Sequence, residues 1–143
     1  MTQKFFAKKG FTLLELLVVI SIIGILMTLG VVAFSTAQKK GRDAKRRGDV
    51  KAMQSAFEQY YSASTNSSYG VGCASMASTA YFPSGALPVD PKTGDDYDCD
   101  SSATGYCVCA TLEDLTGGNA NGRAGVACTY AAAGTDYCLS NLQ

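Results

Sequence analysis

The chain contains no histidine, the side chain that most often serves as a general base in enzymes and as a ligand for transition metals. It also shows no glycine-rich phosphate loop ahead of a helix and no nucleophile-elbow motif. No other group of residues forms a recognisable catalytic constellation. The sequence therefore predicts a protein that is not an enzyme and that holds no resident cofactor.

Proline is scarce as well: the chain has three, and none lies between Phe11 and Tyr81. Because proline breaks the interior of a helix, its absence allows one helix to run from Thr12 to about Ser62. Fifty helical residues form a rod of about 75 Å, far longer than the helices of ordinary globular domains. The sequence thus predicts a helical stalk.

The first part of this predicted helix is an apolar segment, residues 11–34. Its only polar residues are Thr12, Glu15, Ser21 and Thr28. About 20 helical residues span the roughly 30 Å of a bilayer's hydrocarbon core, so the segment is long enough to cross a membrane. Glu15 is the exception, because a carboxylate costs roughly 2.5 kcal/mol or more near the bilayer centre and less toward its edge.

The residues that lead into this segment are Lys8-Lys9-Gly10-Phe11-Thr12-Leu13-Leu14-Glu15. They resemble the N-terminal signature of type IV pilins and of the pseudopilins of type II secretion systems. The resemblance implies that a prepilin peptidase cuts after Gly10 and that the new N-terminus, Phe11, is then N-methylated. It also implies that Glu15 pairs with the terminal amine of a neighbouring subunit during filament assembly.

By the same resemblance, residues 1–10, with Lys8 and Lys9, form a leader peptide. The partners would be the peptidase, the pilus or secretion assembly machinery, and further copies of the chain in a helical filament. The protein would cross the bacterial inner membrane once, with its head outside, and then enter a periplasmic or extracellular filament. Adhesion, motility, secretion and DNA uptake all remain open as the filament's role.

The chain departs from many family members at Val32, where they carry a proline that unwinds the helix in their filaments. Within the apolar segment only Gly24 and Gly30 weaken the helix, each by about 1 kcal/mol relative to alanine. We therefore expect any unwinding to lie between these two glycines.

Other interpretations of the N-terminal part stay open. A conventional signal peptide would be cut after Ala33-Phe34-Ser35, and an uncleaved anchor would keep Met1. The alternative function is a monomeric, membrane-anchored extracytoplasmic binding module that does not polymerise. In that case Glu15 would simply reach toward water near the cytoplasmic face.

Charge is distributed unevenly, with ten lysines and arginines against three acids before residue 52 and two against nine after it. Residues 35–62 carry most of the cations, which we call the basic neck: Lys39, Lys40, Arg42, Lys45, Arg46, Arg47 and Lys51. They are expected to form a solvated collar near lipid headgroups or to contact the acidic heads of neighbouring subunits.

DNA binding is a more specific alternative for these cations, but no aromatic residues lie between them for base stacking. Because the neck carries more positive charge than the leader, the positive-inside rule alone would favour an orientation with the head in the cytoplasm.

The end of the predicted helix has one apolar face, formed by Val50, Met53, Phe57 and Tyr60 at spacings of three and four. This face predicts the core of a head, residues 63–143. Strands are expected at 106–112, 126–131 and 137–139. The predicted fold class is α+β, a long N-terminal helix packed on a small antiparallel sheet.

All six cysteines follow the membrane segment: Cys73, Cys99, Cys107, Cys109, Cys128 and Cys138. An even number within a small head predicts disulfides and an oxidising compartment. The expected pairs are Cys99–Cys107, Cys128–Cys138 and Cys73–Cys109. A zinc site is less favoured, because histidine is absent and the two cysteines at 107 and 109 are too close for a zinc knuckle.

An acidic loop within the head is the candidate calcium site, with four carboxylates from Asp95, Asp96, Asp98 and Asp100. An EF-hand is excluded, because Ser101 and Cys107 occupy the positions of its glycine and its last glutamate. A looser calcium site remains an expectation, and a solvated turn is the alternative.

Overall fold

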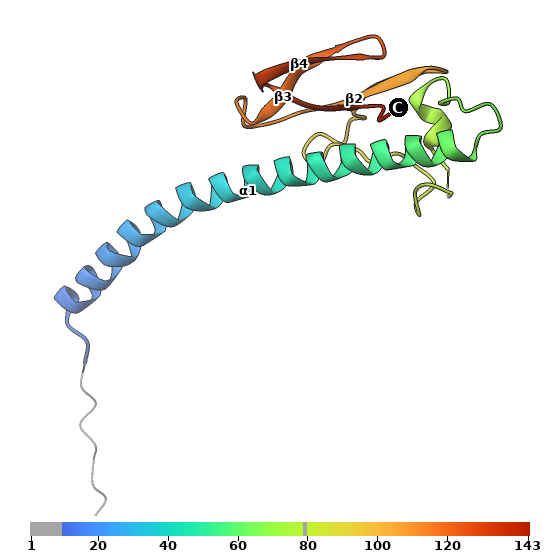
Figure 1. Ribbon diagram of the computed structural model, residues 1–143. Helices are drawn as coiled ribbons and strands as arrows, with labels where there is room; N and C mark the ends of the chain where they lie inside the picture. The colour runs from blue at the N-terminus through green and yellow to red at the C-terminus, as the bar shows by residue number, and fades with distance from the viewer. Residues whose placement is uncertain (1–9, 79) are drawn as a thin grey trace, which may run out of the picture. The chain divides into compact units, whose positions relative to one another are not determined.

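The computed structural model describes residues 10–78 and 80–143, so the leader positions Lys8 and Lys9 lie outside the described residues. The chain divides after Ala37 into two units, which are described separately. Helix α1 covers Leu13–Ala63 and a short 3₁₀ helix, η1, covers Cys73–Met76. The five strands are β1 (Asp98–Ser102), β2 (Gly105–Thr111), β3 (Gly118–Ala124), β4 (Ala127–Gly134) and β5 (Asp136–Ser140) (Figure 1).

Helix α1 confirms the long helix expected from the lack of proline. Gly24 and Gly30 both lie within it, and the helix is continuous across them in the single chain. The unwinding expected there is thus not a property of the isolated chain. For a filament it stays a prediction.

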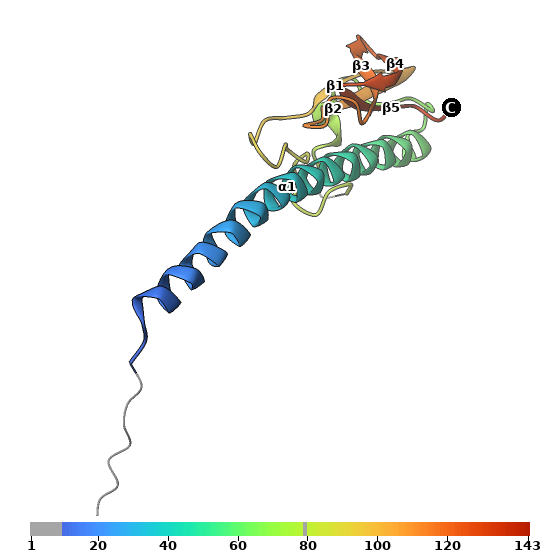
Figure 2. The ribbon, with the colours of Figure 1, turned by 90° about the vertical axis from the view of Figure 1, so that its left-hand side faces the viewer.

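The strands form one antiparallel sheet in the order β1-β2-β5-β3-β4. Figures 1 and 2 show this sheet on one side of the part of α1 that belongs to the second unit. A long helix packed on a small antiparallel sheet confirms the predicted α+β fold.

Strand β2 is buried on both of its faces. Its residues alternate, so that Tyr106, Val108 and Ala110 join the core against α1, while Cys107 and Cys109 join a second cluster on the opposite face. A strand buried on both faces reads as a continuous apolar run, which is why this strand was predictable from its sequence.

The core against α1 is centred on aromatic contacts. The ring of Phe57 stacks on that of Tyr106 with centroids 4.2 Å apart, and the edge of Tyr69 meets Tyr106 at 5.0 Å. The carboxylate of Glu58 accepts hydrogen bonds from the hydroxyl groups of both tyrosines and from the backbone N–H of Leu142. Burial and this carboxylate raise the pKa of Tyr69 to about 12, so its phenol remains a donor at neutral pH. One acid thus joins the helix, the sheet and the C-terminal residues.

Val50, Met53 and Phe57 are buried, as the periodicity predicted, and Tyr60 packs against the core while half-buried. The strands expected at 106–112, 126–131 and 137–139 correspond to β2, β4 and β5.

Strands β1 and β3 were not expected from the sequence. Strand β3, Gly-Asn-Ala-Asn-Gly-Arg-Ala, has no β-branched or aromatic residue. Glycine is required at its first position because the backbone comes very close to its neighbour there: a Cβ on Gly118 would collide with the carbonyl oxygen of Asp136. The composition of residues 118–124 favours a loop, but in the folded chain this segment pairs with its neighbours as a strand.

The three disulfides join Cys73 to Cys99, Cys107 to Cys128 and Cys109 to Cys138, so all three expected pairings were wrong. Cys99 lies opposite Val108 in the β1–β2 register and therefore shares the face toward α1, whereas Cys107 lies on the other face. Cys138 lies directly opposite Cys109 in the β2–β5 register and pairs with it, which leaves Cys128 of β4 to pair with Cys107. Cys107 and Cys109, two positions apart on β2, share one face and do not pair with each other.

We expect Phe57→Ala to lower the free energy of unfolding by about 3–5 kcal/mol, because the substitution opens a cavity beneath the stacked Tyr106. Urea titration of the full chain in detergent micelles, followed by tyrosine fluorescence, measures this. Val71→Ala is the matched control, since that side chain is 79% exposed and should change stability little. Equal losses for both variants would contradict the described core.

Candidate functional site

The first turn of α1 holds the candidate assembly residue, Glu15. Thr12 is the residue before the helix, and its backbone N–H and hydroxyl donate to the Glu15 carboxylate at 2.9 and 2.8 Å. In return, the Glu15 backbone N–H donates to the Thr12 hydroxyl oxygen at 3.2 Å. This is a capping box, which satisfies free N–H groups at the helix start. Sequence reasoning missed the role of Thr12, although the spacing Thr-x-x-Glu ahead of an apolar run signals it.

The bond between Gly10 and Phe11 lies just before the helix, in backbone without regular structure. Both residues are exposed, and a Cβ added to Gly10 would meet no atom within 4 Å. No contact within the described chain therefore requires glycine at this position. Any such requirement would come from a molecule that binds the bond.

Every large apolar side chain of the first unit after Gly10 is exposed, and α1 is long and apolar enough to cross a membrane. The hydroxyl groups of Ser21 and Thr28 donate to the carbonyls of Leu17 and Ile25, each at 2.7 Å. Their hydrogen-bonding needs are thus met within the helix, as an apolar surrounding requires. Glu15 is the only charged residue between Phe11 and Gln38.

Most cations of the basic neck are exposed, as a solvated collar requires, but Arg42 and Arg46 are not. Arg46 is 3% exposed, and its guanidinium pairs with Asp43 of the same helix at 2.7 Å, with Glu113 at 3.1 Å and with Asp90. Arg42 also pairs with Glu113. We call these five residues the docking cluster, because they tie α1 to the loops around the sheet.

Two further contacts extend the attachment. The Asp43 carboxylate accepts the backbone N–H groups of Glu113 and Asp114, at 2.9 and 3.0 Å. Arg47 donates to the carbonyl of Gly117 at 2.7 Å and lies over the ring of Tyr137. The neck arginines therefore contact the head of their own chain. From the sequence they were expected to contact the heads of neighbouring subunits, and such contacts stay a prediction.

The same contacts shift the pKa values of the docking cluster. The hydrogen bond from Arg46 is the main reason why the pKa of Asp90 lies well below its usual value. Hydrogen bonding from Arg42, and then from Arg46, lowers the pKa of Glu113 from 4.5 to about 2. Arg42 and Arg46 are held by carboxylates, whereas the other five cations of the basic neck are exposed, and one of these, Lys45, pairs with Asp49. The DNA-binding alternative thus has fewer free cations than the sequence implied.

The acidic loop is not one open turn. Asp98 and Asp100 belong to β1, and both pair with Arg123 of β3, at 2.6 and 3.3 Å. Asp95 and Asp96 are exposed beside the bridge that joins residue 96 to Val89. An arginine therefore already supplies positive charge to two of the four expected calcium ligands, and calcium binding stays a prediction.

Among residues 10–78 and 80–143, one group of acids or cysteines lies close enough to share a metal ion: Cys107, Cys109, Cys128 and Cys138. Their sulfur atoms lie within 4.8 Å of one another, but they form two disulfides. Disulfide sulfur is not the thiolate that binds metal, so these residues act as structural cross-links.

Comparison with known proteins bears on the N-terminal features. Residues 6–31 match the family model described as the prokaryotic N-terminal methylation motif, which is the leader signature of type IV pilins and pseudopilins. The motif indicates a pilin-like, structural subunit that prepilin peptidase processes, and with the apolar helix it fits a single-pass inner-membrane protein. The match ends within α1. No curated protein and no solved structure matches the chain.

We expect the folded head to lose stability as the pH falls from about 4.5 toward 2. The pKa of Glu113 is lower in the folded state, so its contribution is complete above the ordinary value of 4.5 and disappears as the pH approaches about 2. Glu113→Gln should lower stability at neutral pH and flatten this part of the profile. Urea titrations of the full chain between pH 2 and 7 measure it.

Asp95→Asn is the matched control, because that carboxylate is exposed and accepts no hydrogen bond from the described residues. It should keep the wild-type dependence on pH. A wild-type slope in the Glu113→Gln variant would show that the docking cluster is not formed.

Proposed function

We propose that this chain is a pilin-like subunit that is cut after Gly10, N-methylated at Phe11 and polymerised through its apolar helix into a pilus or pseudopilus. The observation that carries the proposal is the position of Glu15, the one charged residue of an exposed apolar segment, held at the first turn of α1 directly after the proposed cut.

The position of the proposed cut supports processing. The Gly10–Phe11 bond lies in exposed backbone outside the helix, where a peptidase does not have to unwind helical structure to reach it. Because no contact among the described residues requires glycine at position 10, the peptidase would be the source of that requirement.

Cutting changes the electrostatics of the segment. Among the described residues, the Glu15 carboxylate is met by the neutral donors of Thr12, which satisfy hydrogen bonding but leave a net negative charge. Removal of the leader creates a cationic amine at Phe11. Opposite charges attract far more strongly at low dielectric than in water, so the amine of a neighbouring subunit would be favoured beside Glu15.

Polymerisation would also give the apolar segment a partner. Its exposed side chains would pack against those of neighbouring helices in place of lipid, with the heads outward. Before assembly, the segment would hold the chain in the inner membrane with the disulfide-bonded head in the oxidising compartment outside. The filament would then be periplasmic or extracellular.

Mass spectrometry of the protein from its native cells is expected to find Phe11 as the first residue, with one added methyl group. Gly10→Val should prevent the cut because of its side chain. Gly24→Val should be cut normally, because a Cβ at position 24 also meets no atom within 4 Å but lies away from the cut. An intact Met1 in the native protein would favour the monomeric anchor.

Glu15→Gln is expected to be cut normally but to be missing from filaments sheared from the cells, because the amide cannot neutralise the neighbouring amine. Ser21→Ala is the matched control, since it removes another polar group of the same segment and should assemble. Normal filaments of the Glu15→Gln subunit would contradict the charge-pairing step while leaving processing in place.

A further inference from the structure

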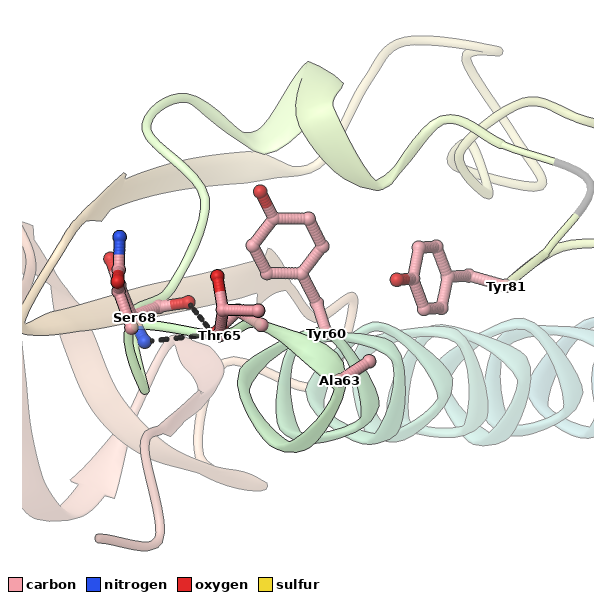
Figure 3. Close-up of a pocket in the computed structure, with 7 residues that line it drawn as sticks. Tyr60, Ala63, Thr65, Ser68 and Tyr81 are labelled. Carbon is pink, nitrogen blue, oxygen red and sulfur yellow. Dashed lines mark hydrogen bonds between the residues drawn. The ribbon is translucent and has the colours of Figure 1, made fainter.

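A cavity of about 450 Å³ lies at the C-terminal end of α1, within the second unit (Figure 3). Its size falls in the range of roughly 300–1,000 Å³ that is typical of small-ligand pockets. The last turn of the helix, the loop that follows it and Tyr81 form its walls. None of these residues takes part in the processing or assembly steps described above.

Two aromatic rings form one side of this cavity. Tyr60 comes from α1 and Tyr81 from the loop before β1, with ring centroids 6.1 Å apart and planes inclined by 56°. Both side chains are half-buried and pack against the hydrophobic core, which restricts their motion. Figure 3 shows both rings at the same opening, with Thr65 on the other side of Tyr60.

The opposite side of the cavity is a loop that its own hydrogen bonds hold in place. The Ser64 hydroxyl donates to the carbonyl of Tyr61 at 2.9 Å and accepts the backbone N–H of Ser68 at 3.0 Å. The Ser68 hydroxyl donates to the carbonyl of Tyr69 at 3.1 Å. These two serines are therefore occupied with the shape of the loop.

Four other polar groups of the lining remain available to a ligand. The hydroxyl groups of Tyr60, Tyr81 and Thr65 and the amide of Asn66 form no hydrogen bond with any described residue. Together they offer donors and acceptors, since each hydroxyl group does both and the amide has two donor hydrogens and an acceptor oxygen.

The lining carries no ionisable acid or base other than the two phenols. A phosphate, a metal ion or a charged peptide would find no opposite charge there. A neutral sugar fits the lining better, because its C–H faces pack against the negative faces of aromatic rings while its hydroxyl groups both donate and accept hydrogen bonds.

A proline-rich peptide is the main competitor, since such segments also bind aromatic surfaces. Proline has no N–H donor, however, so it would cover the hydroxyl and amide groups of the cavity without satisfying their acceptors. The mixture of two rings with four free polar groups favours the sugar.

We propose that this cavity binds a neutral sugar unit of a glycan, packed against Tyr60 and Tyr81 and hydrogen-bonded by Thr65 and Asn66. The binding would give the head a recognition activity beyond its place in a filament. It requires neither cutting nor polymerisation.

Saturation-transfer NMR of the unassembled full chain tests this, with lactose, maltose and N-acetyllactosamine as probes at millimolar concentration. Lipid nanodiscs are needed, because common detergents carry glucose or maltose headgroups that belong to the proposed ligand class. Transfer to at least one sugar is expected. Asn66→Ala and Thr65→Ala should each weaken that binding by about five- to tenfold, the effect of one lost hydrogen bond.

Tyr81→Phe should bind nearly as well as wild type and Tyr81→Ala should not bind, since the ring supplies the packing surface. Tyr130→Ala is the matched control on β4, where that tyrosine is 55% exposed, and it should bind normally. Disulfide mapping of each variant checks that the head is folded. Absence of transfer to all three sugars, unchanged binding in the Asn66 and Tyr81 alanine variants, or preference for a proline decapeptide would overturn the proposal.

Discussion

The carboxylate of Glu15 must be matched by positive charge if the apolar segment enters hydrocarbon, where an unmatched carboxylate costs roughly 2.5 kcal/mol or more. The segment itself has no lysine or arginine, so the match must come from its end or from another molecule. Thr12 donates hydrogen bonds to the carboxylate but does not neutralise its negative charge. This is why leader removal and assembly belong together in our account: the cut creates the missing cation.

The second unit meets the opposite requirement within one chain. Arg46 is buried, and a buried guanidinium is tolerated only when carboxylates surround it, as Asp43, Asp90 and Glu113 do here. Removing one partner of such a buried group typically costs about 3–5 kcal/mol. Part of the uneven charge of the sequence therefore docks the helix on its own head. In our proposal, the apolar segment provides the contacts between subunits.

Much of the fold was predictable because single-residue preferences and periodicity pointed the same way. The lack of proline predicted α1, and the spacing of Val50, Met53 and Phe57 predicted its buried face. Strand β2 was predictable from its apolar run. The candidate assembly site could also be recognised from the sequence, since its residues are contiguous and match a known motif.

What the sequence could not reveal depends on contacts between distant segments. Strand β3 includes Gly118, which admits close backbone packing against Asp136, although the composition of the strand resembles that of a loop. The disulfide pairs follow from strand order and from which face each cysteine occupies, and neither is written in the spacing of cysteines. Arg46 looked like one cation among seven until the fold brought Asp90 and Glu113 to it, beside Asp43 of the same helix.

The central claim is that charge at the first turn of α1 is neutralised between subunits. Electron cryo-microscopy of filaments from cells that produce this chain measures it most directly. Our account predicts apolar helices packed along the filament axis, with the Phe11 amine of one subunit within about 4 Å of the Glu15 carboxylate of its neighbour. A filament in which Glu15 faces solvent, or in which each amine meets only the carboxylate of its own chain, would contradict it.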